Sequence, residues 1–176
     1  MLVHPRRIRW FEYSWFRGVA VAFCLAFCLQ AGVGRGADRP IEKLAAPDAD
    51  AQQAAEKQIR TVFKSDYENS KSPAQKLEFA KKLYRHGLTM DDDPVARFVL
   101  LRTSRNLAMQ AGQADVALQA VDGLEKFYDV NAIELKVEAL EAVVAKLRTA
   151  DDHRQIPAPA LALVEQALAA DRLDIA

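Results

Sequence analysis

The chain has 176 residues, and its 24 Lys and Arg against 24 Asp and Glu give a formal net charge of zero. Residues 1–36 have the pattern of an export signal; setting aside everything up to Ala37 leaves 19 basic and 23 acidic residues, a charge of −4. That balance argues against a nucleic-acid surface. Both cysteines fall in the set-aside segment, which argues against a disulfide or a cysteine-based metal site in the mature chain.

The predicted signal peptide has a basic start and a short apolar centre. Four arginines lie within residues 1–17, and the apolar run Gly18–Leu29 follows them. Twelve residues are too few to span a bilayer comfortably but suit the apolar region of a signal peptide. We expect cleavage after Gly34 or Gly36, where glycine occupies both small-residue positions. The mature protein is then exported and has no stable membrane span.

Three alternatives for this segment are less favoured. A twin-arginine signal would use Arg6-Arg7, but Arg9 stands where that pattern needs a bulky apolar residue. Lipoprotein processing at Cys24 or Cys28 would place a phenylalanine where a small residue is needed. The third alternative is that the segment stays uncleaved as an anchor.

The mature chain is predicted to be all-α. Residues 37–50 contain two prolines and scattered charges, which indicates a linker, and 51–176 show helical spacing with no strand-like alternation. We expect stacked antiparallel hairpins, either a solenoid or a small helical bundle, of about six helices. Their expected ranges are 50–68, 72–87, 93–112, 114–128, 131–150 and from 159 onward.

Several helix ends have clear capping signals. Asp50 is expected to cap the first helix, and Ser72 to cap the second in a capping box with Gln75. Gly87 is expected to end that helix in the left-handed conformation. Asp93 followed by proline opens the third helix, and Gly112 ends it.

Two features predict close packing of the third and fourth helices. The third helix has one apolar face from Val95 to Ala111, while Leu100 and Leu107 lie off it, which predicts contacts on two sides. Gly123 lies in the middle of the fourth helix, where glycine costs about 1 kcal/mol relative to alanine. A closely approaching neighbour would explain it.

The turn between these helices points to a repeat. The segment Ala108–Gly112 is followed by Gln-Ala-Asp-Val-Ala117, and this resembles the turn of a tetratricopeptide repeat. Residues 170–176 align with residues 111–117 at an offset of 59, so Asp171–Ala176 is expected to be another turn and the start of another helix. We therefore expect the domain to continue beyond the given C-terminus.

The chain also resembles an uncharacterised helical region found near the N-terminus of large exported bacterial proteins. The residues that carry this likeness are Ile59–Lys64, Asp92–Pro94, Arg97–Arg102 and Ala167–Ala176. They are caps and core positions, so the resemblance implies a fold and an exported location but no chemistry.

Candidate chemical groups are few. Asp91–Asp93 suits a Ca²⁺ or Mg²⁺ site, but helix capping is the favoured interpretation because no EF-hand loop follows. His86 and His153 are the histidines after the signal peptide, and neither has a metal ligand three or four residues further on. A site formed by His153 with the neighbouring Asp151 and Asp152 is a less favoured alternative. Lys76, Lys81, Lys82 and Arg85 are expected to form a solvated helix face. Six aromatic residues are expected in the core or at hairpin edges, with a peptide-binding groove as the alternative: Tyr67, Phe79, Tyr84, Phe98, Phe127 and Tyr128.

These observations favour a non-enzymatic, exported helical-repeat module that packs against a protein partner or against further repeats or domains of the same polypeptide. The alternative is an accessory region of a larger exported enzyme whose catalytic domain lies outside this chain. A small exported enzyme or metal binder is the third possibility. We assign no catalytic, cofactor-binding or metal-binding residues and expect no nucleic-acid partner.

Overall fold

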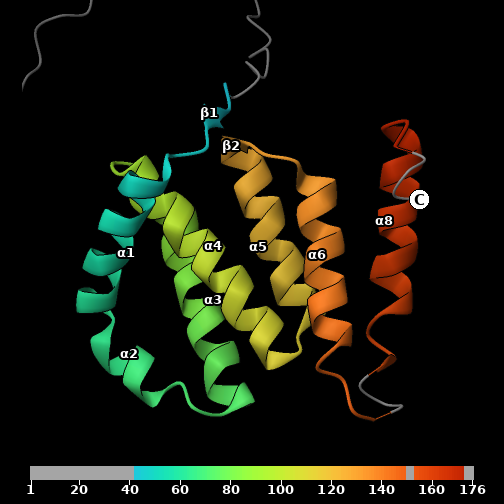
Figure 1. Cartoon of the computed structure of the whole chain (residues 1–176), viewed down its shortest axis with the longest axis horizontal. Coiled ribbons are helices and arrows are strands. Elements are labelled where there is room, and N and C mark those ends of the chain that lie inside the picture. Colours follow the sequence, from blue (N-terminus) through green and yellow to red (C-terminus); the bar gives the residue numbers. More distant parts are fainter. Residues whose placement is uncertain (1–41, 150–152, 173–176) are drawn as a thin grey trace, which may run out of the picture. The chain divides into compact units, whose positions relative to one another are not determined.

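A computed structural model describes residues 42–149 and 153–172, which belong to one compact unit. The predicted signal peptide lies outside the described residues, as do the first residues of the predicted linker and the last four of the chain. The all-α prediction is confirmed. The helices are α1 (Ala49–Val62), α2 (Lys64–Asn69), α3 (Pro73–Thr89), α4 (Pro94–Ala111), α5 (Ala114–Phe127), α6 (Ala132–Val144) and α8 (Pro157–Ala169) (Figure 1).

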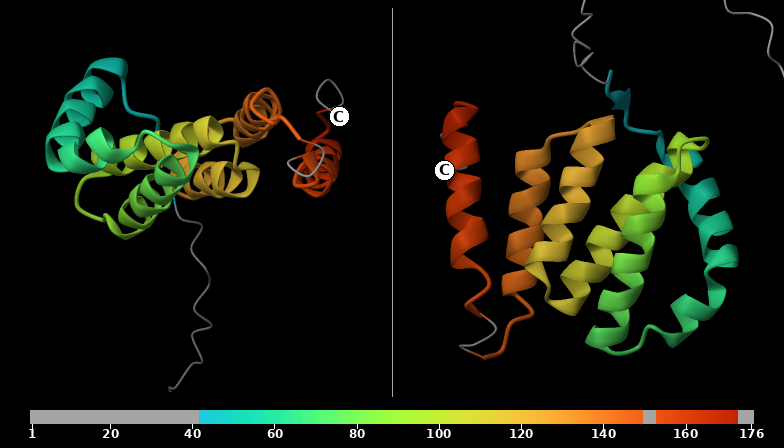
Figure 2. Two further views of the ribbon diagram at one scale, coloured as in Figure 1. Left: turned by 90° about the horizontal axis from the view of Figure 1, so that it is seen from below. Right: turned by 180° about the vertical axis from the view of Figure 1, so that it is seen from behind.

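The helices alternate between two layers. Seen from below, α1, α4 and α6 lie in one layer, and α3, α5 and α8 in the other (Figure 2). Each helix from α3 onward packs against the next one along the chain, while α1 and α6 also contact α4 within its layer. α4 is therefore the central helix, and α8 lies at one end of the array.

The first predicted helix is divided in two. Residues 50–68 were expected to form a single helix, but the backbone leaves helical geometry at Phe63, between α1 and α2. The ring of Phe63 lies against those of Phe79 and His86, at centroid distances of 6.1 and 5.4 Å. Asp48, and not Asp50 as predicted, caps α1 by accepting a hydrogen bond from the backbone N–H of Ala51.

Helix α3 begins as predicted and ends later than predicted. Ser72 and Gln75 form the expected capping box. The prediction that Gly87 ends the helix is wrong, because α3 continues to Thr89. Gly87 is instead buried at a crossing, where an added Cβ would lie 2.9 Å from the side chain of Leu101. Its lack of a side chain, and not its conformational freedom, explains glycine at this position.

Helix α4 has the predicted ends. The Asp93 carboxylate accepts a hydrogen bond from the N–H of Ala96, and Gly112 ends the helix with a φ of 72°. The two predicted apolar faces are confirmed, because Leu100 and Leu107 are buried along with Leu101. α4 thus packs against helices on both sides.

Helices α5, α6 and α8 differ from their predicted ranges mainly at the ends. α6 stops at Val144 and not near residue 150, and α8 begins at Pro157, two residues before its predicted start. The close approach predicted at Gly123 is confirmed, since a Cβ there would lie 3.1 Å from Leu101. Both buried glycines therefore accommodate the same leucine side chain.

A short strand pair was not predicted. Leu44–Ala45 (β1), within the predicted linker, pairs in parallel with Tyr128–Asp129 (β2), which follows α5. Two residues are too few to give an alternating pattern, so the sequence carries no signal of period two for either strand. Within the predicted linker, Leu44 and Ala45 thus belong to β1, and Ala49 belongs to α1, one residue before the predicted start of the first helix.

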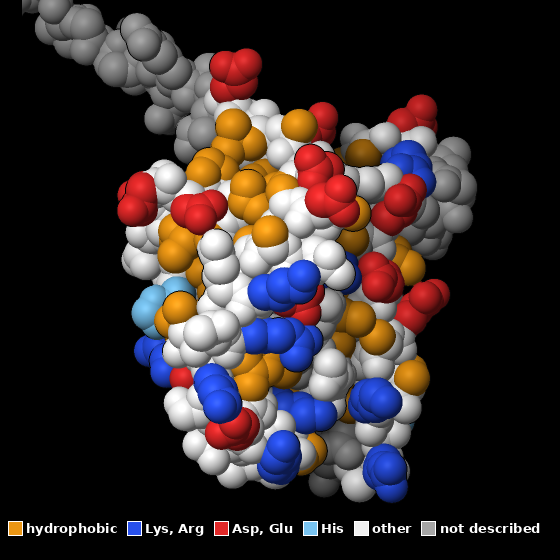
Figure 3. All heavy atoms as spheres, turned by 60° about the vertical axis from the view of Figure 1, so that its left-hand side comes forward, with side chains coloured by type: hydrophobic (Ala, Val, Ile, Leu, Met, Phe, Trp, Pro, Cys, Tyr) orange, Lys and Arg blue, Asp and Glu red, His pale blue; other side chains and the backbone are white. Residues whose placement is uncertain are grey.

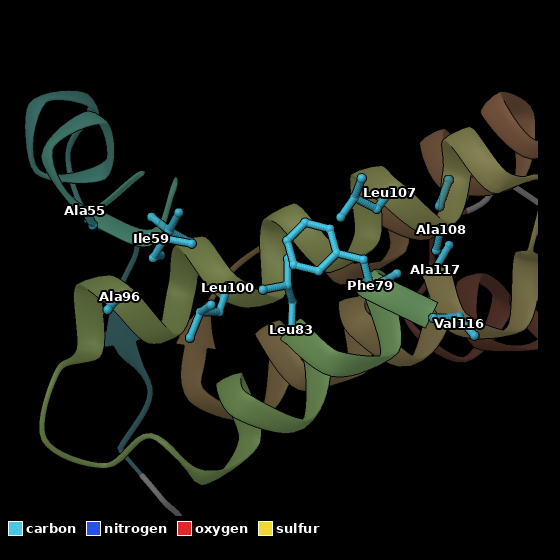
Figure 4. Close-up of a cluster of buried hydrophobic side chains, with 13 residues drawn as sticks. Ala55, Ile59, Phe79, Leu83, Ala96, Leu100, Leu107, Ala108, Val116 and Ala117 are labelled. Carbon is cyan, nitrogen blue, oxygen red and sulfur yellow. The ribbon is translucent and has the colours of Figure 1, made fainter. Parts of the chain in front are cut away.

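The main core lies between α1, α3, α4 and α5. Buried side chains from these helices meet around Phe79, Leu83, Leu100 and Ile59 (Figure 4). The buried Ser104 hydroxyl donates a hydrogen bond to the carbonyl of Ala80 across the α3–α4 contact, at 2.8 Å. The hydroxyl is therefore satisfied, and the two helices are linked by a polar contact within an apolar region. In the described ranges we find no helix with the length and apolarity to cross a bilayer.

Candidate functional site

The outer surface of α8 is the most unusual surface in the described part of the chain. Its sequence, Pro157–Ala169, contains only Glu165 and Gln166 as polar residues, so the helix is apolar on nearly every side. Only Leu163 and Ala167 are buried. Leu161, Val164 and Leu168 are 66%, 36% and 52% exposed. These three residues share one face at helical spacing, and we call them the α8 stripe.

Helix α8 is attached to the array by a narrow contact with α6. Leu163 lies in a buried cluster with Ala114, Leu140 and Val143. A helix that is apolar all round is normally covered on more than one side. The contact with α6 covers one side of α8 and leaves the stripe uncovered in the described residues.

A polar contact reinforces this attachment. Lys136 on α6 is buried, and its Nζ lies 2.8 Å from Asp122 and 3.5 Å from Glu125, both on α5. The same Nζ donates a hydrogen bond to Gln166 on α8, at 3.0 Å. One ammonium group thus joins three helices. Lys136 carries no signal of this role in the sequence, because an isolated lysine on a helix usually indicates solvent exposure.

Helices α4 and α8 end in the same way. At the end of α4, Gly112 has a φ of 72° and the N–H of Gln113 donates to the carbonyl of Ala108. At the end of α8, Asp171 has a φ of 55° and the N–H of Arg172 donates to the carbonyl of Ala167. Both are Schellman-type endings, at the offset of 59 residues found in the sequence. Asp171 replaces the glycine that this conformation favours.

Helix α4 carries three arginines that no sequence pattern marks as a group. Arg97 donates to the carbonyl of Met90, pairs with Asp91 at 2.8 Å and lies 4.4 Å from the centre of the Phe127 ring. Arg102 faces α1, where it pairs with Glu56 at 3.1 Å and also contacts Gln52.

The third arginine of α4, Arg105, faces α6 and pairs with Glu138 at 3.3 Å. Arg97 and Arg105 are buried, and Arg102 is partly buried. Their position among apolar residues of a central helix is the only signal in the sequence. The three guanidinium groups link α4 to its neighbours.

The structure separates the roles of the three consecutive aspartates. Asp93 caps α4, and Asp91 pairs with Arg97, while Asp92 is exposed. The capping interpretation is therefore confirmed for Asp93. Across the described ranges, no group of three or more His, Cys, Asp and Glu side chains is placed to hold a metal ion.

The two histidines have different surroundings. His86 is exposed on α3 and contacts the ring of Phe63 edge-on. His153 is exposed just before α8, and its backbone carbonyl accepts a hydrogen bond from Ile156. Asp151 and Asp152, which the sequence placed beside His153, lie outside the described residues.

The basic residues of α3 are mostly paired. Lys82 pairs with Asp66 on α2 at 2.9 Å, Lys81 with Glu78 at 3.0 Å, and Lys76 contacts Gln110 on α4.

Together with Arg85, Lys82 borders an open cleft of about 500 Å³ between α2 and α3, with Phe79 among its lining residues. Two acidic residues, Asp66 and Glu78, line the cleft with these two basic ones, so it has no dominant charge. On the side of the molecule formed by α1 and α2, Lys and Arg gather in the lower half (Figure 3).

The aromatic residues form two separate clusters. Tyr67 and Phe79 meet edge to face at 4.8 Å, and Phe98 and Tyr128 at 5.0 Å. Burial raises the pKa of the hydroxyls of Tyr67, Tyr84 and Tyr128 above the usual tyrosine value. The Tyr128 hydroxyl donates to the carbonyl of Pro94. The core prediction holds for Phe79, Phe98 and Tyr128, which are buried.

The fold defines an all-α protein whose helices alternate between two layers, and among the described residues the end helix α8 is incompletely covered. Comparison with known protein families, curated proteins and solved structures found no match.

Proposed function

We propose that this chain is an exported helical-repeat module without enzymatic activity, which works by packing against a protein partner. The single observation that carries the proposal is the α8 stripe, an apolar helix face with no cover in the described residues. Exposed apolar patches on folded proteins commonly mark interaction sites. The mechanism is surface complementarity along stacked helices.

The matching ends of α4 and α8 support the repeat character of the module. The two helices share the offset of 59 residues, the left-handed residue and the same closing hydrogen bond. α4 is covered by helices on several sides, whereas α8 contacts mainly α6. In the described residues α8 ends like α4 but lacks the neighbours of α4, so it is suited to receiving a helix from a partner.

A photo-crosslinking amino acid placed at Leu168, in the organism's own cells, tests this proposal. We expect a discrete covalent adduct that mass spectrometry assigns to one polypeptide. The same group at the exposed Gln58 on α1 is the control and should give no such adduct. The absence of any adduct at Leu168 would contradict the proposal.

The mass and N-terminal sequence of the native protein test the exported location and the alternative function. Export predicts a mature start at Arg35 or Ala37. A mature mass far above that of this chain after cleavage, together with a catalytic activity that requires residues outside it, would favour the alternative of an accessory region in a larger exported enzyme. An N-terminus at Met1 would contradict signal cleavage.

A further inference from the structure

We propose that the α8 stripe is a self-association surface, which pairs antiparallel with the same stripe on a second copy of this chain. The inference rests on the proposed packing function and deepens it by naming the partner. It follows from the position of the stripe relative to the helix end, from its chemistry and from its spacing.

The corresponding face of α4 shows that this position is a site of helix contact. Counted back from the shared ending, the residues of α4 that match the stripe are Arg102, Arg105 and Met109. Arg102 pairs with Glu56 on α1, and Arg105 with Glu138 on α6. Neighbouring helices therefore lie on both sides of this face of α4, and a helix neighbour is expected at the same face of α8.

The chemistry of the stripe selects the kind of neighbour. The helices beside α4 offer carboxylates to its arginines, but the α8 stripe has only hydrocarbon side chains, so its partner must also be apolar. Six large apolar residues are well exposed in the described residues, and three of them form the stripe. The other three, Leu44, Val62 and Val144, lie on three different elements. The described chain therefore offers one apolar helix stripe that could meet it, its own.

The spacing of the stripe fits a two-fold axis. Val164 lies three residues after Leu161 and four before Leu168. In an antiparallel pair with the axis near Val164, Leu161 of each copy faces Leu168 of the other, and the two valines meet. Glu165 is the one charged residue between Pro157 and Ala169, and it lies beside the stripe next to Val164. The Glu165 carboxylates of the two copies therefore approach each other near the axis, and their repulsion weakens the pair.

The size of the surface predicts a weak dimer. A helix of 13 residues is about 20 Å long, and one helix pair buries less than the roughly 1,600 Å² of a standard interface. We expect a dissociation constant on the order of 10–100 µM. The protein should be largely monomeric when dilute and dimeric when concentrated.

Sedimentation velocity of the purified protein over a range of concentrations tests the inference. The wild type should shift from monomer to dimer, and the variant Leu161→Glu/Leu168→Glu should raise the dissociation constant by at least about tenfold. Ala162→Glu is the matched control, because Ala162 is exposed on α8 and off the stripe, and it should still dimerise. Circular dichroism verifies that both variants keep the wild-type helix content. A wild type that stays monomeric at all concentrations overturns the inference, as does a dimer that both variants leave intact.

Disulfide cross-linking gives a second measurement, which uses cysteine variants and so does not depend on whether the glutamate variants stay folded. With Cys24 and Cys28 replaced by alanine, Val164→Cys should form a disulfide-linked dimer on mild oxidation, and Ala162→Cys should form much less. Equal cross-linking at the two positions would overturn the inference. If the protein stays monomeric and Leu168 cross-links to a different polypeptide, the inference is wrong but the proposed function stands. If Leu168 gives no adduct, the proposed function fails as well.

Discussion

Helices α4 and α8 end with the same backbone geometry but differ in how they are covered. α4 is flanked by α3 and α5 and also contacts α1 and α6, and ten of its residues are buried. α8 contacts mainly α6, and two of its residues are buried. The comparison shows that a local ending is determined by a few residues, whereas the stability of a helix depends on its neighbours. The centre and the end of the array should therefore respond differently to equivalent changes.

The largest expected difference comes from removing one leucine from each helix. Leu101→Ala empties a fully buried position between Gly87 and Gly123, and should lower the free energy of unfolding by about 2–5 kcal/mol. Leu163→Ala on α8 should lower the free energy of unfolding by about 2 kcal/mol, the low end of the same range, because the open surroundings of Leu163 can relax around the smaller side chain. Urea denaturation measures both. A cost at Leu163 equal to that at Leu101 would remove the distinction between centre and end.

Substitutions at the two helix endings should change the free energy of unfolding in opposite directions. Gly112→Ala places a side chain in the left-handed region and should destabilise the protein by about 1–2 kcal/mol. The nearest atom to the added Cβ lies 3.7 Å away, so the cost is one of backbone conformation. Asp171→Gly removes the same strain and should stabilise α8 by up to about 1 kcal/mol. Amide hydrogen exchange of α8 together with urea midpoints measures both. Destabilisation by Asp171→Gly would contradict the shared geometry.

Alkaline pH should weaken the centre of the array more than its end. Burial raises the pKa of Tyr67, Tyr84 and Tyr128 in the folded protein. The neutral hydroxyls therefore contribute fully to the free energy of unfolding below the unfolded tyrosine pKa of about 10. This contribution is lost as the pH rises through the higher folded values. The stability advantage of the wild type over Tyr128→Phe should shrink by up to about 1.4 kcal/mol per pH unit above pH 10. Urea midpoints at pH 7 and pH 11 test this. A constant difference between the two proteins would show that ionisation of Tyr128 is not involved.

The smallest expected effect is at Lys136. Lys136→Met removes its contacts to Asp122, Glu125 and Gln166. It should change global stability by less than about 1 kcal/mol, because the side chains of Asp122 and Glu125 are 58% and 42% exposed and solvent screens their attraction to the ammonium group. The amides of α8 should nevertheless exchange faster, since a contact that holds the helix is lost. Lys57→Met, on the exposed face of α1, is the control. Equal exchange in the two variants would mean that Lys136 does not hold α8.

The sequence predicted features that depend on a few neighbouring residues. The capping box at Ser72, the cap at Asp93 and the end at Gly112 are local patterns, and all three are confirmed. The end predicted at Gly87 is wrong because that glycine responds to Leu101 on another helix. The break at Phe63 was not predicted either, and the ring of this residue contacts Phe79 and His86 on α3.

The candidate site was only partly visible in the sequence. The helical spacing from residue 159 onward predicted a helix, and the structure shows that Leu161 and Val164 of this helix are exposed. Periodicity identifies which residues share a face, but it does not report whether a neighbour is present. The bridge from Lys136 to two other helices is equally a property of tertiary packing.

The strand pair between β1 and β2 determines where mechanical load enters the helical array. Leu44–Ala45 is hydrogen-bonded to Tyr128–Asp129, at the junction of α5 and α6, and precedes α1 in the chain. Tension applied to the chain before Leu44 is therefore carried first by this short ladder, in the middle of the array. Helix α1 follows β1 in the chain, so it bears this tension only after the hydrogen bonds between β1 and β2 break.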